Sequence, residues 1–343
     1  MKRALDLALK NSQGARPNPS VGALIVIKDT VLGEGFTSNY GGNHAEINAL
    51  EGICKKNLNL LSQATLYVTL EPCSHTGQTP PCSLAIIRSG IPKVVIGCLD
   101  PNPKVSGRGV KLLSDAKIEV IIGVRENECR EAHRHFLTSQ NLQRPHITLK
   151  WAESKDAFIA PSKEKQLNPK SYWLSHSYSK QWSHKLRAQS MGILIGAETM
   201  RLDQPSLNTR LWKGKDPVIY VLGGKFSDIP NAWFKKKTPI FQFTQTPEKQ
   251  KTRITQIKIN DLSKSVDILL RHCEKHQVQS LLIEGGTQVI NQFLTRNLWD
   301  KAIIFKSLSL LHDGVKAPFI DQRPIESIKS SKDHVLIFRN SST

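Results

Sequence analysis

Hydrophobic and polar positions along the first 140 residues change repeatedly between the period of a helix and that of a strand. Helical spacing is expected over residues 2–10, 44–56, 107–116 and 126–140. Strands are expected over residues 21–27, 31–36, 65–70, 93–97 and 118–122, with a polar loop at 71–81 and Pro80-Pro81 where the next helix begins. Such alternation is typical of a layered α/β domain.

A second pattern begins after Gln143-Arg144-Pro145, which we expect to be a domain boundary. Helices are expected over residues 179–190 and 261–275, an insertion loop over 161–169, and strands over 146–151, 192–196, 217–222, 280–285 and 301–306. The strand at 301–306 is expected to be the last, followed by a polar tail after Asp321. At about 150 residues per domain, a chain of 343 residues has room for two, 1–143 and 144–343.

Composition narrows the class of protein. Hydrophobic residues make up 39% and charged residues 22%, which excludes collagen-like, low-complexity and wholly disordered chains. There is no apolar run of the roughly 18 residues that a membrane span needs. The stretch behind Met1-Lys2-Arg3 is interrupted by Asp6 and Lys10, so we expect neither export nor a membrane partner, and a cytoplasmic location. Without export, the six cysteines are expected to be thiols or metal ligands rather than disulfides.

The chain is strongly basic, with 48 Lys and Arg against 29 Asp and Glu and a net charge of +19. Such an excess suits nucleic acid, but it equally suits phosphorylated small molecules drawn into basic clefts. The positive residues are scattered, and the one dense run is Lys235-Lys236-Lys237, beside Trp233 and Phe234. A run of three lysines is most often a solvated loop, and we expect that here.

One group of residues has the spacing of a zinc deaminase. His44-Ala45-Glu46 precedes Pro72-Cys73, and Cys82 follows Pro80-Pro81, so that one His and two Cys ligands accompany a Glu that does not bind metal. Three protein ligands leave a fourth position for water, whose pKa zinc lowers to about 7. Glu46 is the candidate catalytic residue, carrying a proton from the attacking water to the departing ammonia.

Each of these residues alone has an ordinary explanation. A single His at a helix start is usually a surface or capping residue, and cysteines are often buried thiols. The combination is far rarer than its parts, which favours the deaminase interpretation. His75 is not expected to be a ligand, because a fourth protein ligand would close the site. A contact to substrate or to a ligand side chain is the expected role of His75.

The zinc loop from Pro72 to Cys82 is longer than the C-x-x-C of nucleic-acid deaminases. With Pro17-Asn18-Pro19 before it and Asp100-Pro101-Asn102-Pro103 after it, the chain closely resembles the bifunctional riboflavin-biosynthesis deaminase/reductases over nearly its whole length. The resemblance implies a cytidine-deaminase-like domain that removes an amino group from 2,5-diamino-6-ribosylamino-4(3H)-pyrimidinone 5′-phosphate. It implies Zn²⁺ on His44, Cys73 and Cys82, with Asn18 orienting the pyrimidine.

For the second half the resemblance implies a dihydrofolate-reductase-like domain that uses NADPH to reduce the ribosyl group to ribityl. The matching positions imply cofactor contacts at Ala152, Trp173, Thr199, Asp203 and Gly286, and substrate contacts at Ser171, Arg187, Leu207, Arg210 and Glu284. Guanidinium groups suit a 5′-phosphate, and a Gly-Gly pair between strand and helix lets backbone N–H groups approach a pyrophosphate. Asp203 and Glu284 are candidate general acids. The family also implies a homo-oligomer.

The chain departs from the family pattern at several positions. Ala157 replaces the Gly that usually ends the first reductase strand, and Gln78 replaces a common basic residue of the zinc loop. Gln204 occupies the place of a second acidic or amide residue after the one at Asp203, and Gly223-Gly224 stand where many members have an acidic residue after the strand. No basic residue is assigned to the cofactor 2′-phosphate.

Two alternatives remain open beside the bifunctional enzyme. One is a deaminase with a degenerate, non-reducing C-terminal domain. The other is a nucleic-acid deaminase or RNA-binding protein. The low aromatic content of 6% and the long Cys spacing count against nucleic acid, and we expect a small phosphorylated pyrimidine as the substrate.

Overall fold

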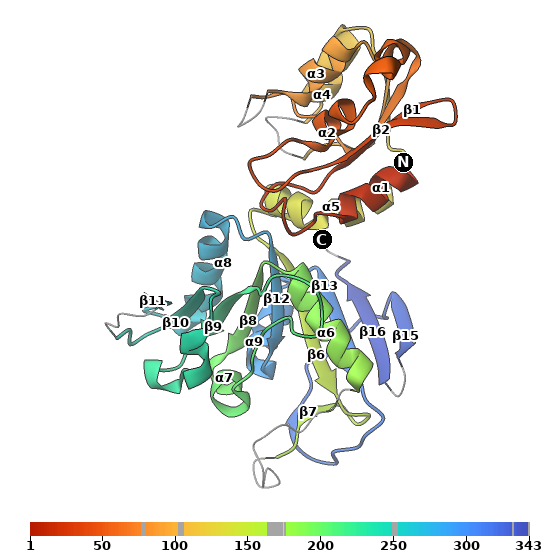
Figure 1. Cartoon of the computed structure of the whole chain (residues 1–343). Coiled ribbons are helices and arrows are strands. Elements are labelled where there is room, and N and C mark those ends of the chain that lie inside the picture. The colour runs from red at the N-terminus through yellow and green to blue at the C-terminus, as the bar shows by residue number, and fades with distance from the viewer. Residues whose placement is uncertain are drawn as a thin grey trace. The chain divides into compact units, whose positions relative to one another are not determined.

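The computed structural model describes residues 1–76, 80–101, 106–162, 174, 176–248, 253–330 and 333–341. Contacts divide the chain into two compact units, Met1–Gln143 and Arg144–Thr343, each with its own sheet and core (Figure 1). Within these residues no helix is long and apolar enough to cross a membrane.

The first unit is built on a five-stranded sheet. Its order is β2 (Thr30–Phe36), β1 (Gly22–Ile27), β3 (Thr65–Leu70), β4 (Lys93–Cys98) and β5 (Glu119–Ile122). β1 runs antiparallel to both of its neighbours, whereas β3, β4 and β5 are parallel. The carboxyl ends of β3 and β4 therefore lie at one edge of the sheet, which is where open α/β sheets bind their ligands.

Helices cover both faces of this sheet, as Figure 1 shows. They are α1 (Lys2–Leu9), α2 (Ala45–Glu51), α3 (Cys82–Ser89), α4 (Arg108–Asp115) and α5 (Glu126–Leu142). Alternate residues of β1 face opposite sides, because side chains along a strand alternate. Leu24 packs with α1, and Ala23 and Ile25 belong to the larger core that also holds the buried alanines of α2.

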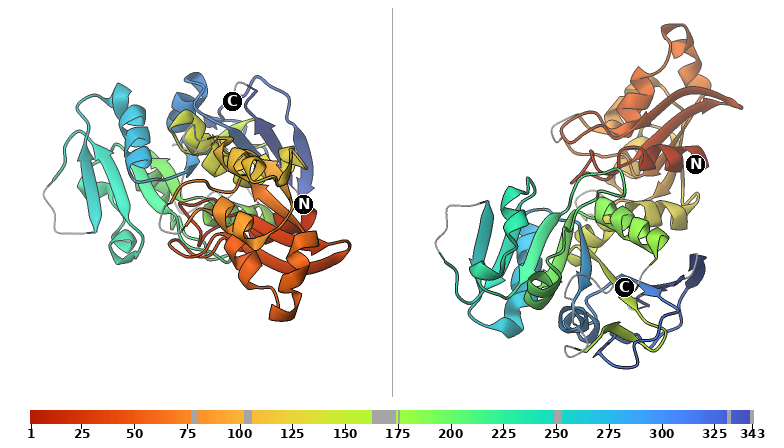
Figure 2. Two further views of the ribbon diagram at one scale, coloured as in Figure 1. Left: turned by 90° about the horizontal axis from the view of Figure 1, so that it is seen from above. Right: turned by 60° about the horizontal axis from the view of Figure 1, so that its bottom comes forward.

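The second unit has a nine-stranded sheet that is parallel except at one end. Its order is β11 (Ile254–Lys258), β10 (Ile240–Thr244), β9 (Val218–Leu222), β8 (Gly192–Gly196), β12 (Ser280–Gly285), β6 (His146–Glu153), β13 (Lys301–Lys306), β16 (Asp333–Arg339) and β15 (Glu326–Ser330). Only β16 and β15 are antiparallel to their neighbours. Both views in Figure 2 place the teal strands β10 and β11 and the dark blue strands β15 and β16 at opposite ends of the unit. A separate two-stranded sheet pairs β7 (Phe158–Ala160) with β14 (Val315–Lys316).

Two apolar layers hold the helices of this unit against its sheet. On one face α8 (Ser265–Lys275) and α9 (Thr287–Thr295) pack on alternate residues of β6, β8, β9 and β12. On the other face α7 (Ala197–Asp203) and the 3₁₀ segment Asn231–Lys235 pack with Ile193, Ile195 and Leu207. α6 (Ser177–Gln189) covers β13 and β16 on that same face. The central strands are buried on both faces, which explains their continuous apolar runs.

Most elements expected from periodicity are confirmed, and two expectations are wrong. The helix expected over 44–56 ends at Glu51, because Gly52 follows and the chain continues as a 3₁₀ segment at Lys55–Gln63. The strand at 301–306 is not the last, because β15 and β16 come after it. β16 is a short apolar run in a polar tail, and pairing with β13 is what buries Val335 and Ile337.

Several expectations fall on residues outside the described part of the chain. These are the insertion loop beyond Ser162, the candidate residues Ser171 and Trp173, and the departure at Gln78.

Candidate active sites

The three zinc-ligand candidates come from three different elements of the first unit. His44 is the residue before α2, Cys73 lies just beyond β3, and Cys82 is the first residue of α3. The Pro80-Pro81 pair fixes the start of α3, since proline suits the first turn of a helix. The backbone N–H of Cys82 donates a hydrogen bond to the Cys73 sulfur at 3.2 Å, which keeps the two ends of the loop together.

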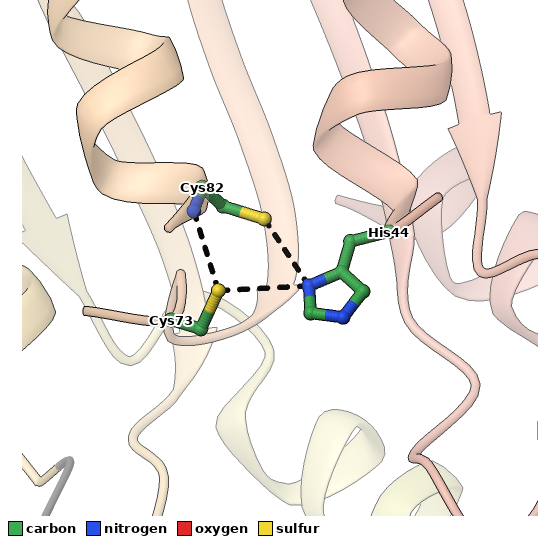
Figure 3. Close-up of side chains that lie close together, drawn as sticks. All are labelled: His44, Cys73 and Cys82. Carbon is green, nitrogen blue, oxygen red and sulfur yellow. Dashed lines mark hydrogen bonds between the residues drawn. The ribbon is translucent and has the colours of Figure 1, made fainter. Parts of the chain in front are cut away.

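The ligand atoms converge as a catalytic zinc site requires. His44 Nδ1 lies 3.3 Å from Cys82 Sγ and 3.5 Å from Cys73 Sγ, and Figure 3 shows this nitrogen facing both sulfurs. Tetrahedral zinc with ordinary bond lengths separates its N and S ligands by about 3.6 Å. All three donor atoms lie within 4.8 Å of one another. The residues present therefore fit a Zn²⁺ ion with one position left for water.

The charges around these residues suit a metal site and a proton carrier. Hydrogen bonding with Cys82 and His44 outweighs burial and lowers the pKa of Cys73, which favours the thiolate form that binds metal. Glu46 is 4% exposed on α2. Burial, reinforced by the nearby Cys73 charge, raises the pKa of Glu46 to about 7. A carboxyl group with this pKa can both accept and return a proton near neutrality.

A pocket of about 310 Å³ opens onto these side chains. It is lined by His44, Glu46 and Cys73 together with the predicted pyrimidine contact Asn18. His75 also lines the pocket, and the group of candidate ligand atoms consists of His44, Cys73 and Cys82. The volume is at the lower end of the usual range for small-molecule sites.

Glu71, between β3 and Pro72, is a pocket-lining residue that the sequence analysis missed. Its buried carboxylate accepts backbone N–H bonds from Asp100, Gly107, Gly109 and Val110, at 3.0 to 3.3 Å. It thereby ties the segment after β4 and the start of α4 to the chain that carries Cys73. The sequence signal that could have identified Glu71 is an acidic residue placed directly between a buried strand and Pro72-Cys73.

In the second unit the predicted cofactor residues gather at the carboxyl edge of the parallel strands. Ala152 is near the end of β6, Thr199 and Asp203 are on α7 directly after β8, and Gly286 follows β12. A Cβ on Gly286 would lie 3.2 Å from Thr199 Oγ1, and Gly285 has φ +147°, so side chains here would fill the space beside Thr199. This glycine-lined edge fits the close backbone approach of a dinucleotide.

The predicted substrate residues Arg187 and Glu284 meet in a buried, two-pronged ion pair. Arg187 Nε and Nη2 donate to the two Glu284 oxygens at 2.8 and 2.6 Å. Burial alone would raise the pKa of Glu284, but the charges of Arg187 and Lys150 lower it to about 2. Glu284 therefore stays ionised at neutral pH and is an acceptor rather than a general acid. Lys150 was missed as a member of this cluster, although a lysine between Leu149 and Trp151 in an apolar strand was a signal.

The other two substrate candidates lie in one loop but expose different groups. Leu207 is 1% exposed, with its side chain in the core, so only its backbone can contact a substrate. Arg210 is exposed, and its Nη1 donates to Asn208 Oδ1 at 2.8 Å. Asn208 also accepts a bond from Arg187 Nη1 at its carbonyl, which connects this loop to the ion pair.

Comparison with known proteins finds a family model for each of the two units. Residues 1–98 match the cytidine and deoxycytidylate deaminase zinc-binding region, and residues 145–332 match the RibD C-terminal domain. The riboflavin biosynthesis protein RibD of Aquifex aeolicus is 36% identical over 98% of this chain and 94% of its own length. The chain belongs to the RibD family.

Solved structures of this family have the same fold over the whole chain. A Thermotoga maritima diaminohydroxyphosphoribosylaminopyrimidine deaminase/5-amino-6-(5-phosphoribosylamino)uracil reductase is 33% identical, with a TM-score of 0.87 and coverage of 99% of this chain and 97% of its own. RibD of Acinetobacter baumannii is 30% identical, with a TM-score of 0.86 and the same coverage.

Membership in the RibD family makes this chain a bifunctional deaminase and reductase of riboflavin biosynthesis. Its cofactors are Zn²⁺ and NADPH, and the His/Cys/Cys cluster fits the first of these. The expected fold class, a cytidine-deaminase-like domain followed by the reductase domain, is confirmed.

The RibD resemblance also explains one departure in this sequence. Ala157 has φ +63°, in the left-handed region that glycine adopts without strain. A glycine at this position would adopt the turn after β6 without this strain. This chain retains the turn with an alanine, and the Ser154 side chain holds it by donating to Asp156 at 2.6 Å.

Proposed function

We propose that the first unit hydrolytically deaminates 2,5-diamino-6-ribosylamino-4(3H)-pyrimidinone 5′-phosphate. We propose that the second unit then reduces the ribosyl side chain with NADPH, giving 5-amino-6-ribitylamino-uracil 5′-phosphate. The observation that carries the first step is the convergence of His44, Cys73 and Cys82 beside the buried carboxyl of Glu46, in a pocket of about 310 Å³.

In the deaminase step His44, Cys73 and Cys82 hold zinc, and Asn18 orients the pyrimidine from the pocket wall. Zinc, when bound, supplies the Lewis acidity that lowers the pKa of a coordinated water. Glu46 takes the proton that the attacking water loses and delivers it to the departing amino group, which leaves as ammonia. The raised pKa of Glu46 supports this role, because proton transfer is most efficient when the carrier titrates near the working pH.

In the reductase step the cofactor is bound by Ala152, Thr199, Asp203 and Gly286. It is also bound by Trp173, which is assigned from its position in the family pattern. The substrate is bound by Ser171, Arg187, the Leu207 backbone, Arg210 and Glu284. The ionised Glu284 carboxylate accepts hydrogen bonds from ribose hydroxyls, and Arg187 keeps it in place. NADPH, when bound, would supply a hydride to C1′ of the sugar as the C1′–O4′ bond opens and the ring oxygen takes up a proton. The residues named here would hold both molecules and keep water away.

The first experiment supplies the purified, zinc-loaded protein with the diaminopyrimidinone ribosyl phosphate, with and without NADPH. We expect ammonia release in both samples and NADPH oxidation with a mass gain of two hydrogens only where the cofactor is present. Deamination without NADPH consumption would identify a degenerate reductase domain. Complete absence of turnover would show that the substrate is wrong, and RNA would be the next substrate to test.

We also propose that the enzyme is a cytoplasmic homo-oligomer assembled through its second unit. The six cysteines are free, as in a reducing compartment. The segment between β13 and β15 exposes Leu308, Phe319 and Ile325, with Phe319 78% exposed. A contiguous patch of exposed apolar side chains marks an interaction surface, and we propose that these three residues contribute to one. Phe319→Ser should lower the mass measured by sedimentation equilibrium, whereas an unchanged mass would exclude this surface.

A further inference from the structure

The 205–210 loop, which carries Leu207 and Arg210, is held by three side chains from two other segments. Trp233 Nε1 donates to the Pro205 carbonyl at 2.9 Å, and Lys236 Nζ donates to the Ser206 carbonyl at 2.5 Å. Asp216 Oδ1 accepts from the Thr209 backbone and hydroxyl at 2.9 and 2.8 Å. The loop is thus fixed before any substrate arrives.

Such fixation is needed because the loop contains a strained residue. Leu207 has φ +48°, which costs a leucine free energy and persists only where the surroundings determine the conformation. Strained positions of this kind concentrate at ligand-binding segments. The bonds to Pro205 and Ser206 act on the two residues directly before Leu207, and the Leu207 side chain is anchored in the core beside Trp233.

Lys236 differs from both of its neighbours in the lysine run. Lys235 and Lys237 are exposed, and among the described residues neither makes a hydrogen bond or an ion pair. Lys236 is half-buried against the 205–210 loop, close enough to Arg187 and Asp216 to interact with their charges. Lys235 and Lys237 are therefore solvated, as expected for a run of lysines, whereas Lys236 faces the 205–210 loop.

The charges around this loop do not cancel. The Arg187 charge is matched by Glu284, and the Asp216 carboxylate, which accepts bonds from the neutral Thr209, interacts with the charge of Lys236. Three cations (Arg187, Arg210 and Lys236) against these two carboxylates leave one net positive charge. Arg210 and Lys236 remain without a carboxylate within ion-pair distance in the described part of the chain. Two cations without ion-pair partners, Arg210 in the loop and Lys236 against it, suit the binding of a phosphate monoester dianion.

We propose that Lys236 supplies a positive charge to the site that binds the 5′-phosphate of the reductase substrate, together with Arg210. One N–H of its ammonium group holds the Ser206 carbonyl, and the other two remain as donors for phosphate oxygens. This inference rests on the proposed reductase function of the second unit. It assigns Lys236 to substrate binding rather than to hydride transfer, so its loss should raise KM more than it lowers kcat.

The test compares the deaminated ribosyl phosphate with the same compound lacking its phosphate, using the full-length enzyme and saturating NADPH. Lys236→Gln keeps a donor for Ser206 but removes the charge, and Lys236→Arg keeps the charge. Lys235→Gln and Lys237→Gln are matched controls that remove the same charge from the neighbouring positions.

In Lys236→Gln we expect the preference for the phosphorylated substrate, measured as a ratio of kcat/KM values, to fall by about tenfold or more. Lys236→Arg should retain most of the preference, and both controls should retain all of it. An equal loss on both substrates would overturn the proposal, because it would show that Lys236 only positions the loop. No loss, or the same loss in Lys235→Gln, would overturn it as well.

A binding experiment separates this proposal from the proposed reductase activity. Calorimetric titration of the full-length protein with inorganic phosphate should show weaker or fewer binding events in Lys236→Gln and Arg210→Ala than in the unmodified enzyme. Equal phosphate binding by the unmodified enzyme and Lys236→Gln would overturn the phosphate assignment. Absence of NADPH oxidation with every substrate, combined with the expected phosphate result, would refute the reductase proposal alone.

Discussion

Arg187 of α6 and Glu284 at the end of β12 are 97 positions apart in sequence and form a two-pronged ion pair, with bonds of 2.8 and 2.6 Å. The pair orients Glu284 and keeps it charged at the edge of the sheet where we propose that cofactor and substrate meet. A third guanidinium bond, from Nη1 to the Asn208 carbonyl, extends the same control to the 205–210 loop. One side chain thus positions two segments of the reductase site.

Replacing Arg187 tests whether its guanidinium positions Glu284 and the 205–210 loop. Arg187→Lys keeps a positive charge but loses the planar fork, so Glu284 and the loop lose a shared partner. We expect reductase kcat/KM to fall by about 10- to 100-fold, with ammonia release unchanged. Arg144→Lys is the matched control, because Arg144 makes a similar buried pair with Asp300 at 2.7 and 2.9 Å. It should lower stability more than the kinetics of the folded enzyme. Equal reductase losses in both variants would refute the positioning role.

Glu46→Gln should abolish deamination while zinc is retained. The amide cannot carry the proton, whereas the three ligand side chains are untouched, and proton carriers of this kind contribute about 10²- to 10⁴-fold in rate. Ammonia release and zinc content, measured on the same sample, check both parts. The NADPH-dependent step, supplied with deaminated substrate, serves as the internal control. Loss of zinc together with activity would count against Glu46 as the proton carrier.

The buried His133 should make the first unit sensitive to acid. His133 Nε2 lies 3.0 Å from Thr69 Oγ1, and burial lowers the pKa of His133 to about 4. In the unfolded chain His133 has an ordinary pKa near 6.5, so the unfolded chain binds more protons than the folded chain between pH 6.5 and 4. The stability that the neutral, buried His133 contributes is fully present above pH 6.5 and decreases as the pH falls toward 4. It amounts to about 2 kcal/mol of lost stability at pH 5.

Urea unfolding at pH 7.5 and pH 5 measures this effect. In His133→Gln the decrease between the two pH values should be smaller than in the unmodified protein, because glutamine does not titrate. The remaining titrating groups are the same in both proteins and cancel in the comparison. Identical decreases would show that His133 is not the group responsible.

Ala157→Gly should stabilise the second unit. A left-handed backbone conformation like that of Ala157 costs an L-residue about 1–2 kcal/mol, which glycine avoids. The greater freedom of glycine in the unfolded chain offsets part of this gain, so the net stabilisation should be about 1 kcal/mol. The melting temperature should rise by roughly 2–4 °C for a unit of this size. Ala160→Gly, in the nearby β7, has no positive φ to relieve and should lower it. A decrease in both variants would contradict the strain argument.

Much of the site chemistry could be predicted without a structure, because it depends on local spacing. His44-Ala45-Glu46 places a ligand and a buried acid at the start of one helix, and Pro80-Pro81 before Cys82 marks the start of another. Helices and buried strands with clear periodicity were found for the same reason. β16 could not be found this way, because Asp333–Arg339 becomes a strand by pairing with β13, some thirty residues earlier.

The roles of charged residues divide in the same way. The sequence by itself determined the candidate zinc ligands, the two-domain order and the Gly-Gly turn after β12, since each depends on neighbours along the chain. Only the tertiary structure decided that Glu71 caps α4, that Arg187 pairs with Glu284, and that Lys236 alone of three lysines faces the substrate loop. Charge and hydrogen bonding act through space, and parallel strands bring distant segments to one edge of a sheet.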